Sequence, residues 1–438
     1  MSRDSRIPGF HRLSVPERRR MLGERTGIPT AELERCIANG GLESITADKM
    51  VENSIGTYAL PFGIALNFRI NGIDQLAPMV VEEPSVIAAA SSAARIVRAC
   101  GGFEAEALGS SMIAQVQLYE VSDIGRAQQR ILAATSELLE LSARAVPNLV
   151  ARGGGARSLE VRDLGDGYLV VHLHVECLDA MGANLVNSIA EALGPRIASL
   201  AGGKLGLRIL SNLCDGRRVR VRCLASSADL EVRSELGSAR HFSGDEVING
   251  IVRASEFAER DAYRAATHNK GIMNGIDSVV IATGNDFRAV EAGAHAYACR
   301  SGCYRPLSRW WREQDHLAGE LVLPLALGVV GGTLRLHGGA RLALQLSGVS
   351  SASELALLAA SVGLASNLAA LRALATLGIQ LGHMSLHARS VAAAAGALDD
   401  EVELVARGLS ERHDVTLRTA QLMLEELRAC RCEGGLVA

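Results

Sequence analysis

The chain has 438 residues, of which 48% are hydrophobic and 21% are charged, and this suits two or three domains with large cores. A formal net charge of -3 and an aromatic content of 3% disfavour nucleic acid or an anionic membrane as a partner. The nine cysteines form no C-x-x-C pair, and the charged N-terminus lacks the apolar core of a signal peptide. We therefore expect a cytoplasmic protein with reduced thiols.

The first part of the chain, from Ser14 to Ile96, is predicted to be mainly helical. Ser14 and Pro16 form a helix-start signal, and Pro84-Ser85 opens an Ala-rich helix that runs toward Arg98.

In the middle of the chain, apolar and β-branched residues alternate with polar ones, and Gly-rich turns intervene. The expected strands are Ala114–Tyr119, Leu159–Arg162, Tyr168–Val175 and Lys204–Ile209, with helices near Ala127–Ala145 and Ala183–Leu193. This pattern predicts a compact α+β unit inserted into a helical domain.

Helices dominate again after Ser243, interrupted by apolar strand-like runs at Ser278–Thr283 and Glu320–Val330. The uncharged stretch between Glu354 and Arg372 is shorter than the ~20 apolar residues that a bilayer needs, so it predicts a buried helix. The predicted fold class is α+β. It comprises a large, mainly helical domain (1–109 and 216–381), a small inserted α+β domain (110–215) and a C-terminal helical segment (382–438).

Two glycine-rich segments, Arg152–Arg157 and Gly328–Gly332, suit either a tight turn or a close approach to a phosphate. Neither is a G-x-G-x-x-G between a strand and a helix, so a nicotinamide cofactor would have to bind outside a Rossmann fold.

Several polar clusters are candidates for chemistry. The segment Glu82–Ser85 places two carboxylates just ahead of a helix N-terminus, where the helix dipole favours an anion; helix capping is the preferred interpretation for Glu82. The run Thr267–Gly275 is too polar for a core strand and too Gly-rich for a stable helix; it predicts either a plain surface loop or an anion-binding loop. Asp286 follows a predicted buried strand, where a carboxylate needs a cationic partner. His383 and His387 share a helical spacing without a third ligand, so we predict no metal site.

Six segments carry a family resemblance. They are E-N-S-I-G at Glu52–Gly56, V-E-E-P-S at Val81–Ser85, D-A-M-G-A-N at Asp179–Asn184, Y-R-A-A-T-H-N-K-G-I-M-N-G-I-D at Tyr263–Asp277, A-T-G-N-D at Ala282–Asp286 and G-H-M-S-L-H-A-R at Gly382–Arg389. In this order, over nearly the whole chain, they resemble the signature segments of class II 3-hydroxy-3-methylglutaryl-coenzyme A (HMG-CoA) reductases. Those bacterial enzymes lack a membrane anchor and interconvert HMG-CoA and mevalonate plus coenzyme A by two nicotinamide hydride transfers.

The resemblance implies a catalytic set of Glu83, Lys270, Asp286 and His387. Lys270 would stabilise the negative charge that develops on the carbonyl oxygen, and Asp286, as a buried anion, would keep the lysine protonated. Glu83 would protonate the oxygen of the aldehyde intermediate, and His387 would protonate the departing thiolate of coenzyme A.

The resemblance also implies binding residues and partners. Ser85, Arg264, Thr267 and Asn274 would bind the hydroxymethylglutaryl group, with the guanidinium on its carboxylate. The nicotinamide cofactor would lie on the small domain against Asp179, Met181, Gly182, Ala183, Asn184 and Val146. The C-terminal segment would close over the site as a flap, and the chain would form a homodimer or a trimer of dimers with a site shared between subunits.

The chain also departs from the family. Val146 stands where relatives that prefer NADH typically have an acid, and Arg144 and Arg152 nearby suit a 2′-phosphate; NADH is therefore favoured only slightly over NADPH. The segment Thr333–His337 and residue Ser366 also differ from what relatives have at these positions.

Two other function classes stay open. A non-redox lyase or thioester hydrolase for the same acyl group would need a metal cluster or an activated nucleophile, and neither pattern is present in the sequence. A catalytically silent relative that acts as a binding protein is disfavoured by the four intact catalytic positions. The sequence leaves the physiological direction of the reaction open.

Overall fold

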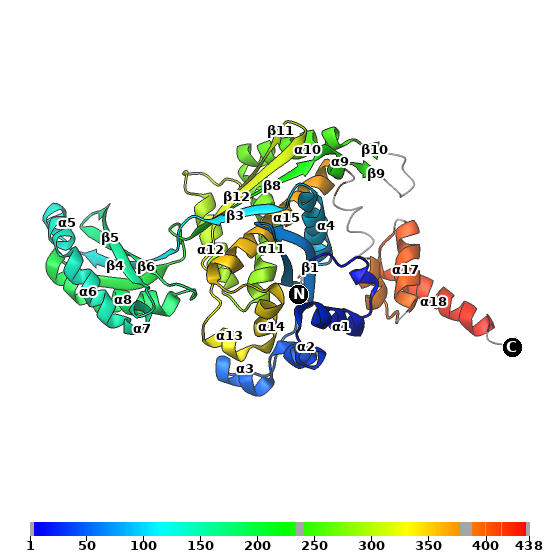
Figure 1. Ribbon diagram of the computed structural model, residues 1–438, viewed down its shortest axis with the longest axis horizontal. Coiled ribbons are helices and arrows are strands. Elements are labelled where there is room, and N and C mark those ends of the chain that lie inside the picture. The colour runs from blue at the N-terminus through cyan, green and yellow to red at the C-terminus, as the bar shows by residue number, and fades with distance from the viewer. Residues whose placement is uncertain are drawn as a thin grey trace.

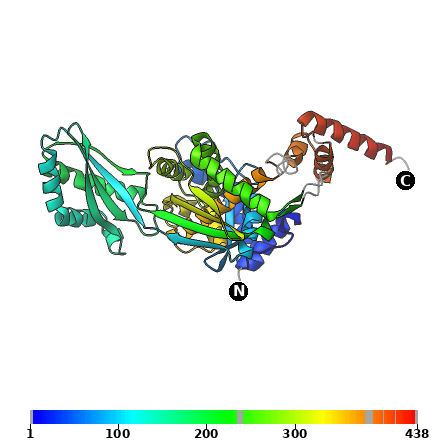
Figure 2. The ribbon, with the colours of Figure 1, turned by 90° about the horizontal axis from the view of Figure 1, so that it is seen from above.

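The computed structural model describes residues 4–233, 241–376, 378, 388–398, 400–412 and 414–434. Figure 1 shows a central body, a smaller body that carries α5 to α8, and C-terminal helices on the opposite side. Seen from above, the three parts form a row (Figure 2). Helices and two main sheets share the described residues, so the predicted α+β class is confirmed.

The central body is built on a six-stranded sheet. In spatial order its strands are β11 (Ser308–Glu313), β12 (His316–Pro324), β8 (Arg218–Ser226), β3 (Phe103–Ala107), β1 (Phe62–Ile70) and β2 (Ile73–Val80). Neighbours pair antiparallel, except that β1 and β3 are parallel. Three helices, α4 (Val86–Ala99), α11 (Ala262–Ala282) and α15 (Ala352–Ala375), pack against this sheet and share its main core.

The prediction that Ser14–Ile96 is mainly helical is wrong for residues 62–80, which form two strands, whereas the predicted helix after Pro84-Ser85 is confirmed as α4. The stretch begins with α1 (Val15–Thr26), α2 (Thr30–Ile37) and α3 (Ser44–Met50), and Ser14 caps α1 in a capping box with Glu17 as predicted. The hairpin β1–β2 then precedes α4. Its turn is Asn71-Gly72, both residues with positive φ, which is the preferred turn chemistry of a two-residue hairpin.

A second correction concerns α11, which covers the predicted loop Thr267–Gly275 and all of the predicted strand Ser278–Thr283 except its last residue. Close packing on α15 explains the tolerated glycine, because a Cβ at Gly275 would lie 2.5 Å from Ser366 Oγ. A glycine in a helix costs about 1 kcal/mol, and burying Ile272 and Ile276 contributes roughly 1.5–3 kcal/mol each, so burial decides in favour of the helix. The run Glu320–Val330 is a strand only as far as Pro324.

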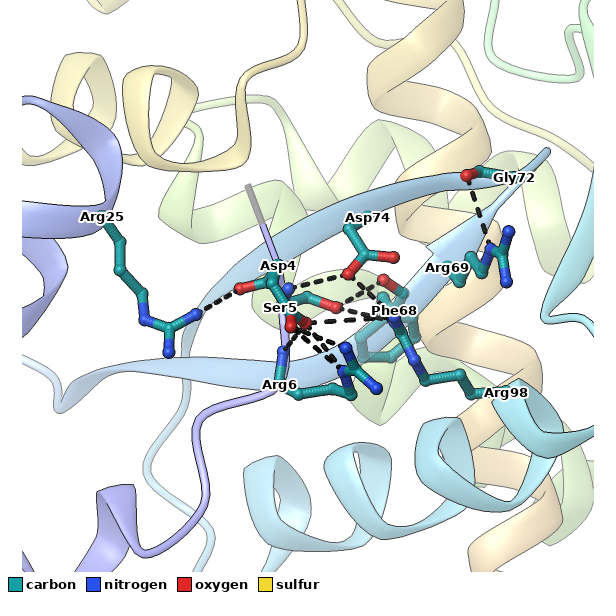
Figure 3. A network of polar contacts seen from close by, with 9 residues as sticks. All are labelled: Asp4, Ser5, Arg6, Arg25, Phe68, Arg69, Gly72, Asp74 and Arg98. Atoms are coloured by element: carbon teal, nitrogen blue, oxygen red, sulfur yellow. Dashed lines mark hydrogen bonds and ion pairs between the residues drawn. The ribbon is translucent and has the colours of Figure 1, made fainter. Parts of the chain in front are cut away.

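A polar network fastens the N-terminal segment and α4 to the β1–β2 hairpin (Figure 3). Ser5 donates from its backbone N to Asp74 and from its hydroxyl to the Phe68 carbonyl oxygen, at 3.0 and 2.8 Å. Arg98, in the last turn of α4, donates to Asp74 Oδ2 at 2.8 Å. A hydrogen bond from Arg6 lowers the pKa of Asp4, which keeps that carboxylate charged beside the arginines. The network fixes the strand and the helix that flank Glu83 and Ser85.

The smaller body is an antiparallel sheet in the order β5 (Gly155–Gly165), β6 (Tyr168–Glu176), β4 (Ser111–Tyr119) and β7 (Lys204–Ser211). All four strands expected in this region are confirmed, and α8 (Ala183–Ala201) extends the predicted helix. The other expected helix is divided at Ala134 into α5 (Ile124–Ala133) and α6 (Thr135–Ala145). The body has its own core and no parallel βαβ unit among its described strands, so its topology is not that of a Rossmann fold.

The remaining elements connect these bodies and form the C-terminal part. They are the 3-10 helices η1 (Phe10–Arg12) and η2 (Ala38–Gly41), the strands β9 (Val232–Arg233) and β10 (His241–Phe242), and the helices α7 (Pro147–Val150), α9 (Ser227–Leu230), α10 (Gly244–Arg260), α12 (Phe287–Ala298), α13 (Gly332–Leu336), α14 (Gly338–Ser347), α17 (Asp400–Glu411) and α18 (Leu417–Gly434). Residues of α17 and α18 share a separate small core with Ala388 and Ala392.

Helix α15 contains the predicted buried stretch. It is long and apolar enough to span a bilayer by composition alone, yet 78% of its most apolar window is buried inside the protein. The expectation of a buried helix is confirmed, and this burial fits a soluble protein.

Candidate functional site

One pocket of about 580 Å³ lies between the start of α4, one face of α11 and the second half of α15. Six residues singled out in the sequence line it: Glu83, Ser85, Arg264, Thr267, Lys270 and Asn274. The fold therefore brings together two of the four expected catalytic residues and all four expected substrate-binding residues.

Helix α11 supplies four of these side chains from a single face. Arg264, Thr267, Lys270 and Asn274 follow one another at intervals of three or four residues, which places them in line along a helix. The helix begins where the Asp261 carboxylate accepts a hydrogen bond from the Arg264 backbone N at 2.8 Å. The prediction of a loop for this segment overlooked the helical spacing of these four residues, although that spacing is visible in the sequence.

Glu83 and Ser85 come from the turn between β2 and α4. Ser85 has a φ of 78°, in the left-handed region that side chains rarely adopt and that costs about 1–3 kcal/mol. Its hydroxyl is buried and has no hydrogen-bond partner in the described part of the chain. A strained residue with an unsatisfied hydroxyl on a pocket wall suggests contact with a bound molecule.

Lys270 and Glu83 form an ion pair on the pocket wall. The Lys270 Nζ lies 2.9 Å from Glu83 Oε2, and the two side chains are 61% and 38% exposed. A fixed cation thus stands beside a carboxyl group that is able to carry a proton.

The expectation of Asp286 as a buried partner of Lys270 is wrong within this chain. Asp286 caps α12, its carboxylate is 42% exposed, and it contacts the Arg288 guanidinium at 3.3 Å. It does not line the pocket. Asp286 lies in the connection between α11 and α12 and not at the end of a buried strand. The cationic partner of its carboxylate is the neighbouring Arg288.

Arg264 is a charged residue of the pocket that has no ion-pair partner in the described part of the chain. Its guanidinium is half-buried and has no carboxylate partner among the described residues, and burial lowers its pKa. A desolvated guanidinium lacking a counter-ion favours an anionic ligand, for which carboxylate geometry is well suited.

The floor of the pocket holds a residue that the sequence analysis did not assign. His268 is 1% exposed, and burial lowers its pKa to about 3, so the imidazole is neutral. The Ser308 hydroxyl donates to Asn367 Oδ1 at 2.8 Å, and it therefore accepts a hydrogen from His268 Nε2 at 2.6 Å. The Nδ1 atom of His268 and the hydroxyl of Ser366 are buried and unpartnered within the described residues.

The expected cofactor residues lie outside this pocket, around the start of α8. Gly182 precedes the helix with a φ of 105°, and a Cβ there would lie 2.4 Å from Cys177 Sγ, so only glycine fits. No side chain caps α8, which leaves its first backbone N–H groups free for an anion. Asp179, Met181, Ala183 and Asn184 lie within three residues of Gly182 along the chain.

Val146 is the exception among the expected cofactor residues. Its side chain is only 5% exposed and packs in the core of the smaller body. The expectation that this side chain contacts a cofactor is therefore not supported, because the core already covers it. Arg144 and Arg152 are both exposed.

His387 lies outside the described residues, as does His383. Among the side chains that the structure describes, no group of three or more His, Cys, Asp or Glu is arranged to hold a metal ion.

One pocket thus holds a lysine, a carboxyl group and an unpaired guanidinium, a set of side chains that suits a small anionic substrate. The family model for hydroxymethylglutaryl-coenzyme A reductase matches residues 14–388. A curated 3-hydroxy-3-methylglutaryl-coenzyme A reductase from Archaeoglobus fulgidus is 46% identical over 429 residues, covering 97% of this chain and 95% of that protein.

Solved structures are similar as well. A 3-hydroxy-3-methylglutaryl-coenzyme A reductase from Streptococcus pneumoniae superposes with a TM-score of 0.80 at 42% identity, covering 96% of this chain and 99% of that one. A class II reductase of the same organism, bound to NADPH in open conformations, matches with a TM-score of 0.79 at 42% identity, covering 84% of this chain and 99% of its own. The chain belongs to the class II branch of the hydroxymethylglutaryl-coenzyme A reductase family, which consists of oxidoreductases.

Proposed function

We propose that this chain interconverts HMG-CoA and mevalonate plus coenzyme A through two nicotinamide hydride transfers, with the acyl group in the pocket between α4, α11 and α15. The observation that carries this proposal is the unpaired Arg264 guanidinium in the same pocket as the Lys270–Glu83 pair. One cation binds the free carboxylate of the acyl group, and the other faces the carbonyl that is reduced.

Each catalytic side chain has a distinct task. Lys270 donates a hydrogen bond to the carbonyl oxygen as negative charge builds up there during each reduction. Glu83, within 2.9 Å of the lysine, delivers the proton that turns the aldehyde oxygen into a hydroxyl. Ser85, Thr267 and Asn274 orient the acyl group from the same wall. His387 protonates the thiolate of coenzyme A as it leaves.

The nicotinamide cofactor, which supplies the hydride, is proposed to bind at Asp179, Met181, Gly182, Ala183 and Asn184. The uncapped start of α8 supports this placement, because its N–H groups suit a pyrophosphate. The buried Val146 offers no basis for choosing NADH, whereas the exposed Arg144 and Arg152 suit the 2′-phosphate of NADPH. We propose that the chain accepts both cofactors.

The site is proposed to be completed by a second copy of the chain. Asp286 stands apart from Lys270 within one chain, so an Asp286 that acts on Lys270 would have to come from a partner subunit. The segment that carries E-N-S-I-G exposes Val51, Ile55 and Tyr58, an unusual apolar display that suits a subunit interface. A homodimer or a trimer of dimers in the cytoplasm is the proposed assembly.

The separate cores support the proposed domain division. The large domain would comprise 1–109 and 216–381, the cofactor domain 110–215 and the flap 382–438. The pocket reaches Thr376 and Gly378, just beyond the end of α15 at Ala375.

Absorbance of the reduced nicotinamide tests the function directly. The purified chain, given mevalonate, coenzyme A and NAD⁺ or NADP⁺, is expected to produce NADH or NADPH. The variant Arg264→Met should raise the KM for mevalonate by about 10²-fold because it removes the carboxylate clamp. Arg253→Met, at an exposed position of α10 outside the pocket, is the matched control. Release of free coenzyme A or acetoacetate from HMG-CoA without nicotinamide turnover would replace the proposal with a hydrolase or a lyase.

A further inference from the structure

The turn that precedes α8 is held by a buried arginine that none of the motifs contains. Arg217 lies between β7 and β8, at the connection from the smaller body to the large sheet, and it is 7% exposed. One of its terminal nitrogens donates to the carbonyl oxygens of Ala180 and Met181, at 3.0 and 3.2 Å. The other donates to the Leu327 carbonyl oxygen at 2.6 Å and reaches that of Leu178 at 3.5 Å.

These partners make Arg217 an unusual buried cation. Burial lowers its pKa, and its hydrogen-bond partners in the described structure are backbone carbonyls rather than a carboxylate. The nearby Asp179 carboxylate instead accepts a hydrogen bond from the Ala352 backbone N at 2.9 Å. A planar guanidinium with five donors suits several carbonyls that converge from different segments, and a lysine ammonium has no such fork.

The same turn is tied to the segment that carries Asp286. Asp179 accepts a hydrogen bond at its carbonyl oxygen from Val329 N, at 2.9 Å. Gly328 exchanges two hydrogen bonds with the side chain of Asn285, at 2.8 and 3.1 Å, and Asn285 directly precedes Asp286. A Cβ at Gly328 would lie 2.5 Å from Met181 N, so the two segments are in close contact.

We propose that Arg217 is a positioning residue that holds the turn Leu178–Met181 against the segment Leu325–Val330 and thereby sets where the cofactor lies relative to the acyl pocket. Removing its donors leaves buried carbonyls unsatisfied on both sides of the contact, so the turn is expected to shift. This inference rests on the proposed binding of a nicotinamide cofactor at the start of α8.

Two substitutions test the contact from opposite sides. Arg217→Met keeps the apolar stem and removes the donors, and Gly328→Ala keeps Arg217 but presses a methyl group on Met181 N. Arg217→Lys keeps the positive charge but lacks the planar guanidinium that donates to several carbonyl oxygens at once. The matched control is Arg18→Met on α1, because Arg18 also donates to backbone carbonyls, those of Phe10 and His11, far from α8. Fluorescence of NADPH titrated with the unliganded protein gives the cofactor Kd, and steady-state rates give the KM for mevalonate.

We expect Arg217→Met and Gly328→Ala to weaken cofactor binding by about 10²-fold while the KM for mevalonate stays within about twofold, with Arg217→Lys intermediate. A purely structural role would lower the melting temperature but leave the cofactor Kd unchanged, which would overturn the inference. Equal losses for cofactor and mevalonate would overturn it as well. Should Arg217→Met fail to fold, Arg217→Lys and Gly328→Ala decide the matter. A wild-type chain that binds neither NADH nor NADPH would reject the proposed function and this inference with it.

Discussion

Lys270 Nζ lies 2.9 Å from Glu83 Oε2, and this ion pair joins the middle of α11 to the strained turn before α4. Both side chains are partly exposed on a pocket wall, so the pair contributes little to stability. It lines the same pocket as Arg264, where we propose that the acyl group binds.

Lys270→Ala is expected to reduce turnover by about 10²-fold or more, because it removes the cation under the developing oxyanion. The loss should appear both with the thioester and with free mevaldehyde, since each step builds the same charge. Lys204→Ala is a matched control, because Lys204 forms a similar exposed pair with Glu120 at 2.6 Å away from the pocket. Near-normal turnover of the Lys270 variant would end the assignment.

Mixing two inactive variants tests whether the site is shared between subunits. If Asp286 acts on Lys270 of a partner, co-expressed Lys270→Ala and Asp286→Asn chains form mixed dimers with one intact site each. The unfractionated mixture, in which about half of the dimers are mixed, should then regain about a quarter of the wild-type activity. No recovery in mixed dimers isolated with two different affinity tags would restrict the site to one chain.

His387→Gln is expected to slow the full reaction of the thioester by about 10²-fold and to spare the reduction of free mevaldehyde, in which no thiolate leaves. Comparing both reactions in one variant separates proton transfer from flap closure. His383→Gln, in the same segment, serves as the control. If both reactions of His387→Gln slow equally, the histidine acts on the hydride steps or on closure instead.

Val146→Asp is expected to unfold the smaller body rather than to change the cofactor preference. The side chain is buried in an apolar core, where an unpaired carboxylate costs roughly 3 kcal/mol or more. Asn148→Asp, two residues later and exposed, should leave stability unchanged. Thermal unfolding distinguishes the two variants. A stable Val146→Asp protein with a shifted NADH to NADPH ratio would instead support the prediction that residue 146 contacts the cofactor.

Asp277 predicts a pH dependence of stability. Burial, followed by its hydrogen bond with Glu291, raises the pKa of Asp277 from 3.8 to about 9. The folded state therefore retains a proton that the unfolded chain releases, so this stabilising contribution is complete below pH 4 and is lost as the pH rises toward 9. Asp277→Asn cannot ionise, and its melting temperature relative to wild type should rise by about 2 °C or more between pH 5 and pH 9. Asp48→Asn, at an exposed position, should run parallel to wild type, and so would Asp277→Asn if Asp277 were ionised in the fold.

Local sequence patterns were sufficient to predict the strands of the smaller body and to identify most of the site residues. The core-facing residues of β4 and β6 recur with a period of two, because one face of the sheet packs on helices, and that periodicity is visible without a structure. The motif residues that line the pocket were found by resemblance, which needs no geometry.

Tertiary packing decided the rest. The run from Thr267 to Gly275 is helical because the helix buries Ile272 and Ile276, and its glycines are tolerated because α15, with residues such as Ser366 far along the chain, packs closely against it. Because of the same packing, the apolar run that follows Gly275 forms the end of α11 and not the predicted strand. Val146 is a core residue, and His268 and Arg217 are buried and hydrogen-bonded, through contacts with distant segments. Sequence periodicity records which residues avoid water, but only the folded chain determines which distant groups they meet.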